Sequence, residues 1–410
     1  MTQRQRRSDT PKTSAGSTHI STGKSPQNQA PASVPLLDLS REHIPLRDEF
    51  LAAISRVIDS GRFLHGPEVT QLETAVAAEC GVKHAVACAS GSDAILLALM
   101  ALDIGEGDEV IVPSFTFFAT ASAVWRLGAR PVFVDIDPVT FNLDPQRIEE
   151  AITPLTRAII PVHLFGQCAD MAAIGEIAGR HCLHVIEDAA QAIGAKFEQR
   201  EAGSLSAVGC LSFYPTKNLG AFGDAGMLTT HDAALADRLR LIAGHGMSPR
   251  YYHQVVGINS RLDTMQAAVL NVKLPHLADW TARRAANARR YDELFRDAGL
   301  SEEIATPTCD PRCSHVWNQY TIRVTGGRRD SVKAQLAAAG VGSEVYYPVP
   351  LHLQKCFQSL GYGVGSLPET ERAAREVLSL PVFPELTAAE LSTVVSRMGA
   401  ILTSSLAKAA

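Results

Sequence analysis

The feature that most constrains the fold is an alternation, beginning near residue 84, of short apolar runs with stretches of helical periodicity. The apolar runs are HAVACAS, EVIVPS, RPVFVDID, RAIIPVHLFG and HVIEDAA, and each precedes a polar or glycine-bearing turn. Between them lie helix-like stretches such as AILLALMAL and MAAIGEIAGR. Strands that are apolar on both faces and alternate with helices are typical of a mostly parallel sheet covered on both sides. The sequence therefore predicts an α/β domain.

The pattern changes after about residue 235, where long helical stretches replace the alternation. Pro275 lies inside the longest of them and predicts a kink or break. Beyond it come the strand-like QYTIRVTG, a helix at DSVKAQLAAAG, the segment SEVYYPVP and a final helix from about Thr387. We therefore expect a large domain over residues 34–275 and a smaller C-terminal α/β domain over residues 276–410.

Residues 1–33 differ from the rest, with five basic residues, one acidic residue and almost no large apolar side chains. Such a segment cannot bury enough surface to offset its ordering entropy, so we expect a disordered tail. The whole chain carries a net charge of −5, so its body is acidic and nucleic-acid binding is not expected. No apolar run reaches the roughly 18 residues of a membrane span. Cytoplasm is the predicted location.

The eight cysteines agree with that location, because several lie in or beside apolar segments and resemble reduced core residues. These are Cys80, Cys88, Cys168, Cys182 and Cys210. Cys309, Cys313 and His315 lie close together in the sequence, but no second pair of ligands follows them. We therefore favour loop cysteines over a metal site and predict no metal.

In open α/β sheets ligands gather beyond the carboxyl ends of the strands, so chemistry is expected just after each apolar run. Lys217 stands in such a place, in the segment SFYPTKNLGAFGDAGML. A lysine amine in a poorly hydrated cleft loses its proton readily and can attack a carbonyl to form a Schiff base, which is the chemistry of a pyridoxal phosphate enzyme. Taken alone, a lysine is more often a solvated surface charge.

Other residues after the apolar runs suit the same cofactor. At Ser90-Gly91-Ser92-Asp93 a strand meets a helix through a glycine, an arrangement that can bind phosphate, although for this segment alone ordinary helix capping is the favoured explanation. Asp188 ends HVIEDAA, where its carboxylate could keep a pyridine nitrogen protonated, whereas the neighbouring Glu187 is expected on the opposite face of the sheet. Phe117 could stack on a flat ring, although an aromatic residue near a strand end is more often part of the core. His163 and Gln191 are candidate polar neighbours of the same ring.

Together these segments resemble one family over about residues 35 to 400, the pyridoxal-phosphate-dependent nucleotide-sugar aminotransferases of the DegT/DnrJ/EryC1/StrS group. The resemblance rests on GRFLHGPEV, SGSDAI, PSFTFFAT, FVDIDPVTFNLDP, VHLFGQCADM, IEDAAQAIGA, SFYPTKNLGAFGDAGM, GINSRLDTMQAAVL and YYPVPLH, in the family's order. It implies fold type I, with a mostly parallel seven-stranded sheet in the large domain.

The resemblance also implies residue roles. Lys217 would bond to the cofactor and shuttle the proton, Asp188 would pair with the pyridine nitrogen, and Phe117 would stack on the ring. Gln191 would approach the ring hydroxyl. Gly91, Ser92 and Ser212 would hold the phosphate. Asn259 would reach the cofactor phosphate of a neighbouring subunit, which implies a homodimer with shared active sites, and Arg261, Tyr346 and Tyr347 would lie on the substrate side.

The implied reaction transfers the amino group of L-glutamate to a nucleotide-linked keto-sugar. The runs RYYHQVVGINSRLDTMQAAVL and FVDIDPVTFNLDP resemble enzymes that aminate a UDP-linked 3-keto-N-acetylhexuronate for surface polysaccharide. Tyr346 departs from them, since histidine is expected there, and this keeps open a dTDP- or UDP-linked 3-keto- or 4-keto-deoxysugar.

Three other classes receive less support. Dehydratases of the family carry a histidine where this chain has Lys217. A cysteine desulfurase would need a reactive thiol, for which Cys356 is the one candidate. A non-catalytic pyridoxal-phosphate sensor would lack a catalytic group or carry an added DNA-binding region, and neither is visible in the sequence.

Overall fold

The computed structural model describes residues 31–409, with side chains to residue 403. Most of the predicted tail, residues 1–30, lies outside these described residues. The first described residues pack against the C-terminal part of the chain. Val34 pairs in parallel with Val341, and Nη2 of Arg397 donates to the carbonyl oxygen of Pro31 at 2.8 Å.

The central element is a seven-stranded sheet in the order β1-β9-β8-β5-β4-β2-β3. All neighbouring strands are parallel except β9, which runs antiparallel to both β1 and β8. The expected mostly parallel α/β sheet is therefore confirmed. Its strands are β1 (His84–Cys88), β2 (Glu109–Pro113), β3 (Arg130–Val134), β4 (Thr156–Ile159), β5 (His184–Asp188), β8 (Val208–Ser212) and β9 (Gly226–Thr230).

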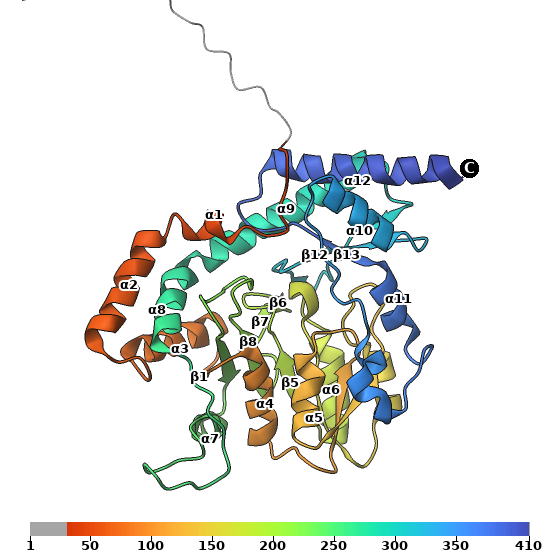
Figure 1. Ribbon diagram of the computed structural model, residues 1–410. Coiled ribbons are helices and arrows are strands. Elements are labelled where there is room, and N and C mark those ends of the chain that lie inside the picture. The colour runs from red at the N-terminus through yellow and green to blue at the C-terminus, as the bar shows by residue number, and fades with distance from the viewer. Residues whose placement is uncertain (1–30, 410) are drawn as a thin grey trace, which may run out of the picture.

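Helices cover both faces of this sheet because its strands are apolar on both sides. Within β2, Ile111 belongs to the core on one face, whereas Val110 and Val112 belong to the core on the other. The first face is covered by α3 (Pro67–Glu79), α6 (Met171–His181) and α8 (Thr264–Lys273), and the second by α4 (Gly91–Ala101), α5 (Ala119–Arg126) and α7 (Ala233–Ala243). Helices α1 (Leu39–His43) and α2 (Arg47–Ser60) form an N-terminal arm (Figure 1).

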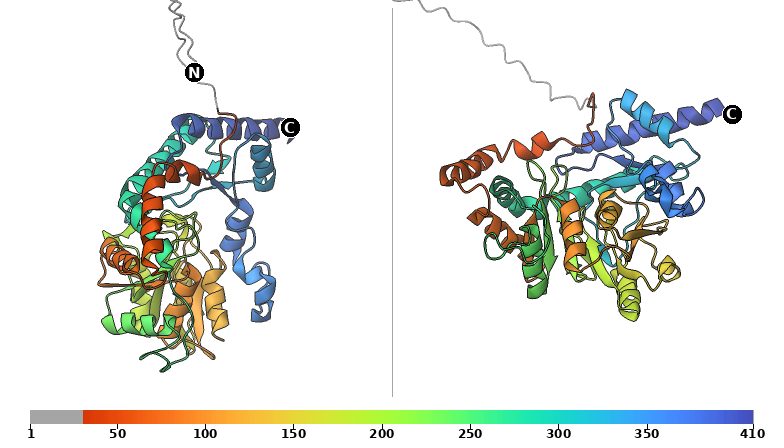
Figure 2. Two further views of the ribbon diagram at one scale, coloured as in Figure 1. Left: turned by 60° about the vertical axis from the view of Figure 1, so that its left-hand side comes forward. Right: turned by 60° about the horizontal axis from the view of Figure 1, so that its bottom comes forward.

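A third core belongs to the C-terminal part of the chain. Its antiparallel sheet has the order β10-β12-β13, with β10 (Ile304–Ala305), β12 (Tyr320–Val324) and β13 (Val377–Leu380). Its helices are α9 (Leu277–Asp297), α10 (Arg329–Ala338), α11 (Pro368–Glu376) and α12 (Ala388–Ala409). The strand and the two helices expected there have formed. Figure 2 shows this part, in cyan and blue, beside the large sheet.

Pro275 lies in a short 3-10 turn, Leu274–His276, that joins α8 to α9, so the helical path bends without being interrupted by a loop. A small third sheet of β6 (Lys196–Phe197), β7 (Arg200–Glu201) and β11 (Cys313–Ser314) also links the two parts of the chain. The boundary at residue 275 stays our proposal.

All eight cysteines lie among the described residues and none forms a disulfide. Cys80, Cys88, Cys168 and Cys210 are buried as expected, but Cys182 is exposed because it ends α6 in a left-handed turn, with φ at 55°. Among the helices of residues 31–409, none combines the length and apolarity needed to cross a bilayer.

Candidate active site

Several of the predicted residues gather at the carboxyl ends of parallel strands of the large sheet. Asp188 is the last residue of β5, where it pairs with Cys210 of β8, and Ser212 ends β8 two residues later. Phe117 follows the end of β2, on the same edge of the sheet. Because parallel strands end on one edge, residues far apart in the sequence meet at a single site.

Asp188 is a buried carboxylate with few partners. Its Oδ2 accepts a 2.7 Å hydrogen bond from the Thr120 hydroxyl, and its Oδ1 accepts a 3.3 Å bond from the Ala190 amide. Burial raises the pKa of Asp188, while the Thr120 bond and the nearby Lys217 oppose the shift. A buried carboxylate of this kind is stabilised by a cationic ligand, and a protonated pyridine nitrogen supplies that charge.

Lys217 lies in the loop between β8 and β9 and is half-buried. Desolvation lowers the pKa of its amine to about 8, and the charge of Asp188 partly opposes this change. The loop around it is held firmly, because Nζ of Lys273 donates to the Gly220 carbonyl at 2.8 Å and Nδ2 of Asn218 donates to the Val316 carbonyl at 2.9 Å. The Lys217 amine therefore loses its proton more readily than an ordinary lysine and is more nucleophilic near neutral pH.

The turn before α4 combines capping with an open group of amides. Oγ of Ser90 accepts from the Asp93 amide at 3.1 Å, so helix capping does occur. Among the described residues, however, the amides of Gly91 and Ser92 have no hydrogen-bond acceptor. A Cβ at Gly91 would lie 2.6 Å from Cβ of Ser212, so only glycine lets the helix approach the end of β8 this closely. The free amides and the Ser212 hydroxyl form a cradle that fits a phosphate.

Aromatic and amide side chains complete the cluster. Phe117 is 58% exposed, which is high for a phenylalanine at a strand end and leaves its ring available to a ligand. The ring centroid of Tyr347 lies 6.2 Å from that of Phe117, and Tyr347 also hydrogen-bonds Gln191. Oε1 of Gln191 accepts from the Phe165 amide at 2.7 Å. These contacts bring Phe117, Gln191 and Tyr347 to the Asp188 side of the site.

His163 differs from the expected polar neighbour of a bound ring. It is fully buried, its Nδ1 accepts from the Ala169 amide, and its Nε2 lies 3.1 Å from Oε2 of Glu187. Since Nδ1 accepts, Nε2 carries the proton and donates to Glu187. Both nitrogens are therefore in use, and a direct polar contact with a ligand is not supported. Sequence could not show this, because the burial depends on how the loop after β4 folds back.

Glu187 has partners quite different from those of Asp188. Its carboxylate accepts from the amides of Gly203 and Leu205, each at 2.7 Å, as well as from His163. Glu187 therefore anchors the connection before β8, whereas Asp188 faces the site. This difference agrees with the alternation of side chains along a strand.

Asn259 and Arg261 lie outside this cluster. Asn259 is exposed and forms an isolated bridge with Gly244, while Oγ of the intervening Ser260 accepts from the Ala89 amide at the end of β1. Arg261 is half-buried and makes no hydrogen bond or ion pair with any residue between 31 and 403. No described contact joins either residue to Lys217.

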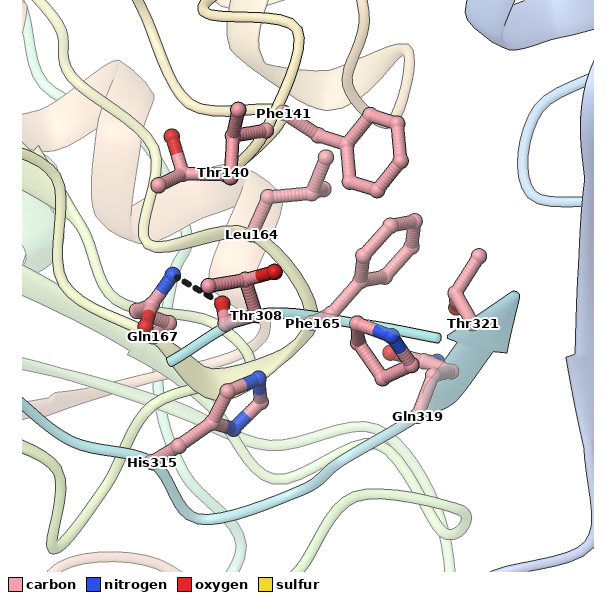
Figure 3. A pocket seen from close by; sticks show the side chains of 11 residues that line it. Thr140, Phe141, Leu164, Phe165, Gln167, Thr308, His315, Gln319 and Thr321 are labelled. Carbon is pink, nitrogen blue, oxygen red and sulfur yellow. Dashed lines mark hydrogen bonds between the residues drawn. The ribbon is translucent and has the colours of Figure 1, made fainter. Parts of the chain in front are cut away.

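Tyr346 is half-buried and lines a cavity beside the Lys217 loop, together with Thr216. Figure 3 shows a different, smaller pocket, in which Nε2 of Gln167 donates to the carbonyl of Thr308. None of the predicted site residues lines it.

His315, at the edge of that smaller pocket, has a stacked and hydrogen-bonded ring. Its ring stacks on Trp317 with centroids 3.9 Å apart, and its Nδ1 accepts from the Trp317 amide. Burial lowers the pKa of His315 to about 3. In the described part of the chain no group of three or more histidine, cysteine or acidic side chains is placed to hold a metal ion.

Thr120 is the site residue that sequence reasoning missed. Its place in the first turn of α5 aims the hydroxyl at Asp188, and Thr120 lies within the motif PSFTFFAT. The signal was its position three residues after Phe117, which places both on the turn that faces the strand ends.

A model of the DegT/DnrJ/EryC1/StrS aminotransferase family matches residues 45–399. A "Pleiotropic regulatory protein" from Geobacillus stearothermophilus is 52% identical over 365 residues, 89% of this chain and 97% of that protein. A dTDP-3-amino-3,4,6-trideoxy-alpha-D-glucose transaminase from Streptomyces venezuelae is 48% identical over 354 residues, 86% and 92% of the two chains.

A UDP-2-acetamido-2-deoxy-3-oxo-D-glucuronate aminotransferase from Pseudomonas aeruginosa is 45% identical over 365 residues, 89% of this chain and 99% of that protein. Among solved structures, the crystal structure of S. venezuelae DesV in complex with a ketimine intermediate superposes with a TM-score of 0.87 at 47% identity, covering 90% of this chain and 98% of the other.

Proposed function

The chain belongs to the DegT/DnrJ/EryC1/StrS aminotransferase family, and from this premise we propose that it moves the amino group of L-glutamate to the C3 ketone of a UDP-linked N-acetylhexuronate. It is a pyridoxal 5′-phosphate-dependent aminotransferase of nucleotide-linked keto-sugars. The observation that carries the chemistry is the pair of Lys217 and Asp188, a lysine of lowered pKa facing a buried carboxylate.

The residues at the site fit the cofactor. When bound, pyridoxal phosphate stabilises negative charge at the substrate carbon that loses or gains the amino group. The open amides of Gly91 and Ser92, with the Ser212 hydroxyl, would hold its phosphate, and Asp188 would hold a proton on its ring nitrogen. Phe117 would cover one face of the ring.

Two side chains, Lys217 and Thr120, then support proton transfer. Lys217 has a pKa close to neutrality, so its amine can both accept and return a proton at the reacting carbon. Thr120 keeps the Asp188 carboxylate oriented through the 2.7 Å hydrogen bond. The surrounding burial lowers the local dielectric and strengthens the attraction between Asp188 and a cationic ring.

The choice of sugar is supported by the names of two relatives and by Arg261. Two relatives are named for amino or keto groups at sugar position 3, one of them a glucuronate and the other a trideoxyglucose. Arg261 has no counter-ion within the described chain, which suits a carboxylate at sugar C6. Tyr346, in contrast, suits a neutral hydroxyl and supports the deoxysugar alternative.

An assay of the purified protein tests the sugar. With glutamate as donor, we expect amination of a UDP-linked 3-keto-N-acetylhexuronate and slower amination of neutral dTDP-linked 3-keto and 4-keto sugars. Turnover confined to the dTDP-linked sugars would reject the hexuronate. If no amino donor changes the absorption spectrum of the yellow protein, the transamination itself is wrong and a sensor role is favoured.

The Lys217→Ala variant tests the catalytic assignment. We expect turnover to be lost, because no amine remains to move the proton, while circular dichroism and thermal unfolding stay close to wild type. The cofactor should then be removable by dialysis. Turnover near the wild-type rate would refute the role of Lys217.

A further inference from the structure

A cavity of about 130 Å³ lies beside the lysine-bearing loop, between that loop and the C-terminal core. Its lining includes Thr216, which directly precedes Lys217, and Tyr346, which we place on the substrate side. A single water molecule needs roughly a tenth of this volume, so a carboxylate with part of its carbon chain fits. The cavity therefore lies next to the candidate site and is large enough for a small ligand group.

Arg284, on helix α9, also lines this cavity. Its side chain is only 4% exposed, yet just one of its three nitrogens has a partner, because Nη1 donates to the Trp317 carbonyl at 3.2 Å. Nε is buried without an acceptor, and Nη2 forms no hydrogen bond with the residues described. A buried guanidinium normally uses its donors fully, so a buried, unpaired Nε beside an unused Nη2 indicates an edge that is open to a planar acceptor.

The nearby carboxylates do not fill this role. Glu42 is 2.5 Å from Nζ of Lys273, with which it forms a buried ion pair. Glu385 acts on Arg284 only at longer range, and within the described chain Arg284 has no salt bridge. Burial lowers the pKa of Arg284 to about 10, although the charges of Glu42 and Glu385 partly oppose this change. The group thus retains its charge at neutral pH while lacking an anionic partner.

We propose that Arg284 is the receptor for a substrate carboxylate, held in a two-pronged contact by Nε and Nη2 in the cavity beside Lys217. The proposal rests on the transamination proposed above, which supplies two ligands that carry this group. One is the dicarboxylate amino donor, and the other is the hexuronate acceptor. The geometry of the fork matches a carboxylate, whereas a neutral hydroxyl would satisfy only one nitrogen.

Binding measurements on the cofactor-loaded protein test this proposal without turnover. Glutarate represents the donor, and UDP-glucuronate is compared with UDP-glucose to represent the sugar carboxylate. In Arg284→Met we expect the dissociation constant of one carboxylate ligand, measured by calorimetry, to rise roughly tenfold to a hundredfold. Binding of UDP-glucose should stay unchanged.

The neighbouring Arg283→Met is the matched control, because Arg283 is exposed and pairs only with Asp279 on the surface of α9. Its binding constants should equal those of wild type. Arg284→Lys, which retains the charge but loses the fork, should recover only part of the affinity. Thermal unfolding will show whether Arg284→Met is folded. If it is not, Arg284→Lys still tests the two-pronged contact.

The outcomes are distinct. Weakened glutarate binding assigns Arg284 to the donor, and weakened UDP-glucuronate binding assigns it to the sugar. Unchanged affinity for both ligands in a folded Arg284→Met overturns the proposal. These binding measurements need no turnover. Failure of the aminotransferase assay would therefore reject the proposed reaction, whereas the role of Arg284 in carboxylate binding would be decided by the dissociation constants alone.

Discussion

At the scale of single residues, Lys217 and Asp188 form a titrating couple whose behaviour can be measured. Burial lowers the pKa of Lys217 to about 8, whereas ordinary lysines titrate near 10.4. Burial also raises the pKa of Asp188, so the two groups shift toward each other. The couple makes the amine both a good nucleophile and a good proton carrier at neutral pH.

Amine-selective labelling of the cofactor-free protein should reveal this shift. We expect labelling of Lys217, followed by peptide mapping, to rise with pH about a midpoint near 8, while exposed lysines respond near 10.4. Since the charge of Asp188 raises the pKa of Lys217, Asp188→Asn should move the midpoint to lower pH. A midpoint near 10.4 in the wild type would contradict the buried amine.

Prediction of residue positions from sequence worked where a side chain follows directly from a strand end, as with Asp188, Ser212 and Phe117, whose roles toward the cofactor stay predictions. It failed where orientation depends on tertiary packing. His163 was expected beside a ligand, but the fold buries it against Glu187. Thr120 was missed although its spacing from Phe117 was a signal, whereas nothing in the residues that flank Arg284 indicates its contact with Trp317.

At the scale of elements, the approach of α4 to β8 defines the phosphate cradle. Gly91 has no space for a side chain, since an added Cβ would also lie 3.2 Å from the Ser212 backbone. The helix start and the strand end are thus packed as closely as their backbones permit. A larger residue must move one of them.

Gly91→Ala should therefore destabilise the cofactor-free protein by about 1–3 kcal/mol. Urea unfolding monitored by fluorescence measures this change. Gly175→Ala is the matched control, because Gly175 is an exposed residue of α6 whose Cβ would meet nothing within 4 Å. That variant should gain about 0.5–1 kcal/mol, as helical alanine is preferred to glycine. Equal stability of both variants would show that the close approach is not required.

Element prediction worked best for the continuous apolar runs, each of which forms a strand of the large sheet. It did not foresee that β9, which follows the Lys217 loop, inserts antiparallel between β1 and β8. Pairing of this kind depends on long-range neighbours, which a local pattern does not contain. At Pro275 the expected break is only a 3-10 turn, because the ring fits the beginning of the next helical segment.

At the scale of the molecule, one projecting segment indicates assembly. Residues 247–256 extend beside α7, in green at the lower left of Figure 1, and expose several large apolar side chains. Tyr251 is 74% exposed and Val256 is 91% exposed. Side chains of this size are rarely left in water together unless a partner covers them, which supports the proposed homodimer.

Val256→Asp tests the contribution of this segment to assembly. We expect analytical ultracentrifugation to show a dimer for the wild type and a dimer dissociation constant raised about tenfold or more in the variant, because a charge would be buried at the interface. The exposed Val364→Asp, far along the chain and 85% exposed, controls for added surface charge. A monomeric wild type would remove the basis for shared sites.

Complementation tests whether Asn259 serves a neighbouring subunit. Asn259→Ala alone should retain the cofactor less tightly. When it is mixed with Lys217→Ala, each mixed dimer contains one site with both native residues, so activity should return to at most half of wild type. Verified mixed dimers without any recovery would place Asn259 and Lys217 in separate functions.

The pairing of Val34 with Val341 has a mechanical consequence. The described chain begins on the C-terminal core, passes through the whole large sheet and returns along α9 to finish on the same core. A pulling force applied at the two ends of the described chain therefore loads the smaller core first. In an optical trap, the C-terminal core should unfold first, at the lower extension. The cofactor-binding sheet should unfold only after that core has unfolded.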